Sequence, residues 1–85
     1  MLNEKITLLA KKLIARGIKP IRIDKWTEFS DPSIWITASI YIQVGIDYIM
    51  IFRDRPYALT MYETTENIND VIGNLRKAID EGKPS

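Results

Sequence analysis

The apolar residues between Ile34 and Val44 fall on every second position. They are Ile34, Ile36, Ala38, Ile40, Ile42 and Val44, and Trp35, Thr37, Ser39, Tyr41 and Gln43 stand between them. Strict alternation with many β-branched and aromatic residues is typical of a strand with one face in a core. The stretch therefore predicts the first strand of a three-stranded antiparallel meander that ends at Tyr62, with one aliphatic and one aromatic face.

The first turn of this meander is predicted at Gly45-Ile46. A two-residue loop there puts glycine at the position where a type II′ hairpin needs a positive φ. In that register Ile42 lies opposite Ile49, and Val44 lies opposite Asp47. Aliphatic residues then meet aliphatic residues on one face, and aromatic residues meet amphipathic ones on the other.

The second turn is predicted at residues 54–56, because Pro56 has no amide hydrogen to give to a ladder. A three-residue loop puts Leu59 and Met61 on the aliphatic face and Tyr62 on the aromatic face, in a strand over 57–62. A two-residue loop would reverse the faces of this strand. The three-residue version is preferred because it keeps the aliphatic face continuous.

Amphipathic helices are predicted on both sides of the strands. The first covers residues 4–16, with Asn3 as its N-cap and Gly17 as a left-handed C-terminal cap. The second covers residues 66–81, with Thr64 or Thr65 as its N-cap. Its interior glycine, Gly73, indicates a close approach to another element.

One further strand is predicted at residues 19–25, where Pro20 favours an edge position. The element order is then α-β-β-β-β-α. We expect an α+β fold, a two-layer sandwich in which both helices cover the aliphatic face of a four-stranded antiparallel meander. A chain of 85 residues predicts a single domain over 1–85, with a frayed tail at 83–85.

The composition speaks against catalysis. Histidine and cysteine are absent, which removes the commonest general base, the thiolate nucleophile and the usual zinc ligands. The acidic residues that remain as candidates stand mostly in turns or at strand ends: Asp24, Asp31, Asp47, Asp54 and Glu63. We therefore expect no enzyme activity, no cofactor and no metal site. No apolar run is long enough for a membrane helix, which favours a cytoplasmic protein without a membrane partner.

The aromatic sheet face is the predicted protein-binding surface. Large aromatic side chains with a polar group are enriched in the centres of protein interfaces. The candidate residues are Trp35, Tyr41, Tyr48, Met50, Phe52 and Tyr62. The partner is expected to be a different protein or a second copy of the chain. Alternatively, the same side chains are ordinary cross-strand pairs on a solvated face, or a helix covers part of them.

A nucleic-acid-binding module is the alternative function. The first helix carries Lys5, Lys12 and Arg16, and the second hairpin tip carries Arg53 and Arg55. These cations could follow a phosphate backbone while aromatic rings stack on bases. Against this stands the formal net charge of only +1. The preferred expectation is a small non-enzymatic binding domain that acts as an inhibitor or adaptor, for example a phage-type inhibitor of a host system.

Overall fold

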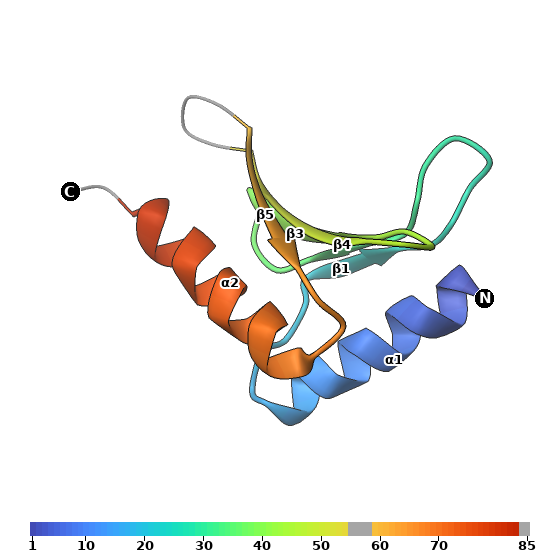
Figure 1. Cartoon of the computed structure of the whole chain (residues 1–85), viewed down its shortest axis with the longest axis horizontal. Helices are drawn as coiled ribbons and strands as arrows, with labels where there is room; N and C mark the ends of the chain where they lie inside the picture. Colours follow the sequence, from blue (N-terminus) through green and yellow to red (C-terminus); the bar gives the residue numbers. More distant parts are fainter. Residues whose placement is uncertain (55–58, 84–85) are drawn as a thin grey trace.

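A five-stranded antiparallel sheet forms one layer of the protein, and two helices form the other (Figure 1). The computed structural model describes residues 1–54 and 59–83. In chain order the elements are α1 (Leu2–Ala15), β1 (Arg22–Asp24), β2 (Ser33–Trp35), β3 (Ile40–Val44), β4 (Ile49–Arg53), β5 (Thr60–Thr64) and α2 (Ile68–Glu81). The strands lie in sequence order, so the sheet is a meander. The predicted α+β two-layer class is confirmed, with five strands in place of four.

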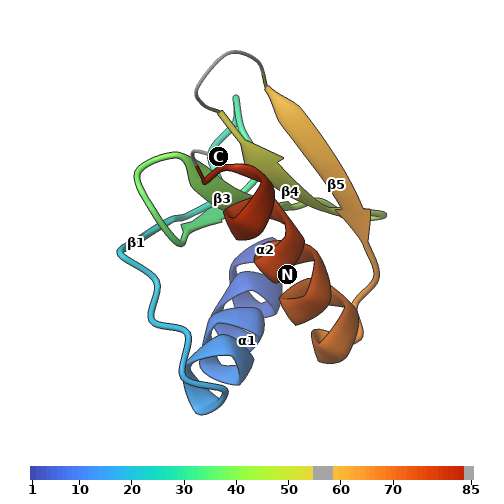
Figure 2. The ribbon, with the colours of Figure 1, turned by 90° about the vertical axis from the view of Figure 1, so that its left-hand side faces the viewer.

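Both helices lie on the same side of the sheet and beside each other (Figure 2). The core between the layers contains the predicted aliphatic face of the sheet and one stripe of each helix. From the strands it takes Ile34, Ile40, Ile42, Val44, Ile49, Ile51 and Tyr62, and from the helices Ile6, Leu9, Ala10, Leu13, Val71, Ile72, Leu75 and Ala78. Neither α1 nor α2 lies on the opposite face of the sheet.

The extra strand arises because the predicted long strand from Ile34 to Val44 is a hairpin. Trp35 pairs with Tyr41, and the chain turns at residues 37–39. The Thr37 hydroxyl accepts hydrogen bonds from the amides of Ser39 (3.2 Å) and Ile40 (3.1 Å) and closes the turn. A three-residue loop keeps paired residues an even number of positions apart, so the alternation continues through the turn without changing phase. Periodicity alone could not reveal this turn.

The next hairpin turns one residue later than predicted. Val44 pairs with Ile49, and the Gly45 amide donates to the Tyr48 carbonyl at 2.9 Å, which leaves residues 46 and 47 at the tip. The register differs by two positions from the predicted one, so each side chain stays on its predicted face. Gly45 does not have a positive φ. Glycine is required there because a Cβ would overlap the ring of Tyr48.

The last strand has its faces reversed relative to the prediction. Ile51 pairs with Tyr62 and Phe52 pairs with Met61, so Tyr62 points into the core and Met61 points away from it. The Tyr62 hydroxyl donates to Oε1 of Glu81 on α2 at 2.6 Å. A large ring with a satisfied hydroxyl thus fills the space under β5 that was assigned to Leu59 and Met61, which are both exposed.

The first helix has a different N-cap from the one expected, while its C-terminal cap is the expected one. Met1 is the N-cap, while the Asn3 side chain accepts a hydrogen bond from the Trp26 amide at 2.9 Å. At the other end Gly17 has a φ of 84°, and the Ile18 amide donates to the Leu13 carbonyl at 3.0 Å. This is the predicted left-handed cap in a Schellman arrangement.

The second helix is capped by Asn67 and not by Thr64 or Thr65. The Asn67 side chain accepts from the Asn69 amide at 2.9 Å. Gly73 lies exposed in this helix, and a Cβ added to it would meet nothing within 4 Å. The predicted close approach at Gly73 is therefore wrong.

We predict that Ile42→Ala lowers the free energy of unfolding by about 2–5 kcal/mol, because Ile42 is fully buried between the layers and the surrounding residues cannot fill the cavity. Ile46→Ala is the control, since Ile46 is 77% exposed and should change the stability by less than about 0.5 kcal/mol. Urea unfolding measures both. Equal midpoints for the two variants would contradict the placement of the core.

Substitution by alanine should change the stability in opposite directions at Gly45 and Gly73. Gly45→Ala should destabilise the protein by about 1–3 kcal/mol, because the methyl group displaces the Tyr48 ring. Gly73→Ala should stabilise it by about 0.5–1 kcal/mol, because alanine restricts the unfolded chain and fits an exposed helix interior. Thermal unfolding of both variants tests the signs. A stabilising Gly45→Ala would show that the ring does not lie over this residue.

Candidate functional site

A row of large side chains crosses all five strands on the face opposite the helices. The pairing register sets Arg22, Trp35, Tyr41, Phe52 and Met61 side by side, one from each strand. We call these five residues the aromatic row. The sheet forms it because every second residue of a strand points to the same face, and neighbouring strands place their partners next to one another.

The rings of the aromatic row stack on each other. The ring centroids of Trp35 and Tyr41 are 4.4 Å apart with an interplanar angle of 30°, and those of Tyr41 and Phe52 are 5.0 Å apart at 17°. Rings at these separations cannot lie next to each other in one plane, so they overlap face to face with an offset. Their faces therefore point along the sheet toward neighbouring strands, and mainly their edges point outward.

The β1 end of the stack is covered by Arg22, and Met61 is the register neighbour at its β5 end. The Arg22 guanidinium carbon lies 4.7 Å from the centroid of the Trp35 ring, which is a cation–π contact on the β1 side. On the β5 side Met61 pairs with Phe52. A flat ligand such as a nucleobase needs an open ring face for stacking. The aromatic row offers edges instead, and these suit packing against side chains of another protein.

Asp24 holds the β1 end of the row in place. Its Oδ2 accepts a hydrogen bond from Nε1 of Trp35 at 3.1 Å, and its Oδ1 lies 3.1 Å from Nε of Arg22. One carboxylate thus fixes both the indole and the guanidinium that covers it. The sequence reasoning did not include Arg22 or Met61. Alternation in β1 already indicates that the Arg22 side chain points to the face opposite that of Ile21 and Ile23. The strand that pairs with β1, however, could not be identified from the sequence.

The other predicted residues of this face lie beside the row. Met50 pairs with Gln43 and Glu63 in the next row of the sheet. Tyr48 lies opposite Gly45 at the edge of the face, and its hydroxyl donates to Oδ2 of Asp31 at 2.5 Å. Of the six predicted protein-binding residues, five therefore lie on or beside the open face. Tyr62 is the exception, because it is buried under the helices.

Burial and nearby carboxylates raise the pKa of two tyrosines on this face. For Tyr48, burial is the main cause, and the hydrogen bond to Asp31 adds to it, which raises the pKa to about 12. For Tyr41, burial again comes first, and the charge of Asp54 contributes. Both hydroxyls are therefore neutral hydrogen-bonding groups at physiological pH.

The four predicted nucleic-acid-binding residues that the structure describes do not share a surface with the aromatic row. Lys5 Nζ lies 2.9 Å from Glu66 Oε1 and donates to the Gly45 carbonyl at 3.1 Å. Its charge and hydrogen bond lower the pKa of Glu66. Lys5 thus ties α1 to the β3–β4 turn and to the segment before α2.

The remaining basic residues are dispersed. Arg16 Nη1 donates to Asn69 Oδ1 at 3.0 Å, and Lys12 is exposed on α1. Arg53 points toward the helix layer, where its Nε donates to the Tyr62 hydroxyl at 3.4 Å. Arg55 lies outside the described residues. Within the described part of the chain, the cations of the nucleic-acid hypothesis lie on the helix side, away from the rings.

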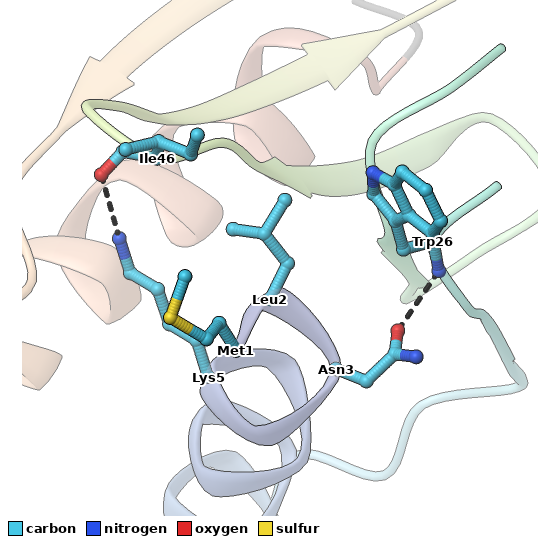
Figure 3. A pocket seen from close by; sticks show the side chains of 6 residues that line it. All are labelled: Met1, Leu2, Asn3, Lys5, Trp26 and Ile46. Atoms are coloured by element: carbon cyan, nitrogen blue, oxygen red, sulfur yellow. Dashed lines mark hydrogen bonds between the residues drawn. The ribbon is translucent and has the colours of Figure 1, made fainter. Parts of the chain in front are cut away.

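A pocket of about 440 Å³ lies at the N-terminal end of α1 (Figure 3). Met1, Leu2, Asn3, Lys5, Trp26 and Ile46 line it. The Asn3 carboxamide and the Lys5 ammonium both bond to backbone atoms of the loops around it. The two polar side chains of the lining, Asn3 and Lys5, are thus both engaged in hydrogen bonds within the protein.

Two further properties bear on the class of function. Across residues 1–54 and 59–83, no three acidic side chains come together in a way that could hold a metal ion. Neither α1 nor α2 is long and apolar enough to cross a membrane.

Comparison of the chain with protein families, with curated proteins and with solved structures found no match.

We predict that the ionisation midpoint of Tyr48 falls from about 12 toward 10 in Asp31→Asn but stays above 10, because burial of the ring persists. The wild-type protein should lose stability as the pH rises from 10 to 12, since tyrosines of the unfolded chain ionise first. Tyr48→Phe should lose less over this range. Ultraviolet titration and urea unfolding measure the two effects. An unchanged midpoint in Asp31→Asn would contradict the hydrogen bond.

Proposed function

We propose that this protein is a non-enzymatic protein-binding domain and that the aromatic row is the centre of its contact surface. The observation that carries the proposal is an ordered stack of rings on a sheet face that no helix covers. On this face Trp35, Tyr41 and Phe52 are half-buried and Met61 is 60% exposed. Open faces with large apolar side chains are a mark of interaction sites in small domains. Such a domain acts by binding to a surface of its partner, as an inhibitor or an adaptor does.

The order of the row supports this proposal. Trp35, Tyr41 and Phe52 support one another, and Asp24 fixes the indole. Side chains that are already held in place lose little conformational entropy when a partner binds, so more of the contact energy appears as affinity. The same stacking also stabilises the sheet through cross-strand contacts.

A nucleic-acid-binding function receives less support from the same geometry. Arg22 covers the outer face of the Trp35 ring, and Lys5 and Arg16 make contacts with Glu66 and Asn69. The proposal includes self-association, in which the partner is a second copy of the chain, since that copy presents the same apolar row on its outer face.

The proposal is tested by photo-crosslinking in the cell from which the chain comes. A benzophenone amino acid at Met61, which is 60% exposed at one end of the row, should form an adduct with one defined protein. The matched control carries the same group at Leu8, which is 55% exposed on α1, and should not form that adduct. Adding Tyr41→Thr to the Met61 variant should abolish the adduct, because it interrupts the stack while threonine suits the strand.

The mass of the adduct identifies the partner, and a mass of two chains would mean self-association. Circular dichroism and urea unfolding confirm that Tyr41→Thr is folded. The absence of an adduct at Met61, or equal adducts at Met61 and Leu8, would refute the proposed surface.

A further inference from the structure

The aromatic row is too small to form a protein interface by itself. Five strands about 4.8 Å apart and up to five residues long span roughly 20 by 17 Å. A stable complex usually buries about 800 Å² on each partner, which is more than twice this area. A partner that docks on the row therefore also contacts the residues around it, and their charges restrict which partners fit.

The residues around the aromatic row are acidic. Asp24 lies next to Trp35, and the Asp54 amide donates to the Ser39 carbonyl at 2.8 Å, which places Asp54 beside the turn that leads into Tyr41. The charge of Asp54 also contributes to the raised pKa of Tyr41. Glu63 is exposed on β5 and points to the same face, because it pairs with Met50. Asp31 accepts the hydrogen bond of Tyr48 at the neighbouring edge. Four carboxylates thus surround the row on the described part of the chain.

Among the residues that the structure describes, the positive charge on this face is small by comparison. The strands carry two basic residues, Arg22 and Arg53, and Arg53 points toward the helices. Arg22 is on the outer face, where it pairs with Asp24, so these two charges offset each other and the carboxylates of Asp31, Asp54 and Glu63 remain. The whole chain has a formal net charge of +1, so the acidic character belongs to this face and not to the protein in general.

We infer that the partner is a different protein whose docking surface carries lysine and arginine around an apolar centre. The inference rests on the proposed function and adds the chemistry of the partner to it. Carboxylates at the rim of an interface speed association with a basic partner and disfavour acidic ones. The apolar centre of the partner packs against the edges of Tyr41 and Phe52, and its cations reach Asp31, Asp54 and Glu63.

The same charges disfavour two other occupants. In a symmetric dimer the same patch is present on both sides, so the carboxylates of one copy would face those of the other. Phosphate groups of a nucleic acid would meet the same repulsion. A basic protein surface avoids both penalties.

The test is a selection from a displayed library of random peptides. Binders to the wild-type protein are kept after depletion on the double variant Tyr41→Thr, Phe52→Thr, which lacks the stack but keeps residues suited to strands. The inference predicts peptides with an excess of lysine and arginine next to apolar residues. Binding of the best peptide should weaken about two- to fivefold in Asp54→Asn and in Glu63→Gln, as expected for one exposed ion pair each. Rising salt concentration should reduce these differences.

Glu4→Gln is the matched control, because it removes the same charge from the first turn of α1 on the helix side. It should leave the affinity unchanged. Peptides that depend on the stack but show no excess of basic residues, or that bind Asp54→Asn and Glu63→Gln as tightly as the wild type, would overturn the inference and leave the proposed function standing. A symmetric dimer through this face at neutral pH and low salt, seen by light scattering, would also overturn it. If no peptide distinguishes the wild type from the double variant, the proposed function fails together with the inference.

Discussion

The pairing of β3 with β4 is the constraint on which the rest of the structure depends. Ile42 and Ile51 lie opposite each other at its centre, and both are fully buried. The neighbouring pair, Tyr41 and Phe52, points the other way and stacks. Since side chains alternate along a strand, the position of the isoleucines under the helices forces the aromatic pair to the outside. Core and candidate binding surface are thus two results of one register.

The helices complete this arrangement without touching the outer face. Leu13 on α1 and Leu75 on α2 are buried against the isoleucine side of the sheet. Lys5 and Tyr62 make the polar contacts that fix the helices to strands and turns. Because the two helices occupy one face, the other remains available. Its aromatic row is ordered by neighbours within the sheet, and the carboxylates around it give the surface its charge.

Residues within one stretch of alternating hydrophobicity could be assigned to a sheet face from the sequence. Residues that follow a loop of unknown length could not. The prediction for Ile42, Tyr41 and Phe52 is correct because the two-position error at the Gly45 turn leaves the faces unchanged. The prediction for Tyr62 is wrong because the assumed length of the β4–β5 connection was off by an odd number of residues, which reverses a strand. Arg22 was missed because nothing local identifies the partner of a short strand.

The sequence by itself determined the class of the fold, the two helices, the glycine cap at Gly17 and the division of the central strands into an aliphatic and an aromatic face. These follow from period and local conformational preference, which a single segment contains. Only the tertiary structure decided that residues 37–39 form a turn, that Tyr62 is buried against Glu81, and that five strands bring Arg22, Trp35, Tyr41, Phe52 and Met61 into one row. These features depend on contacts between distant segments, and such contacts are fixed by packing and register across the whole sheet.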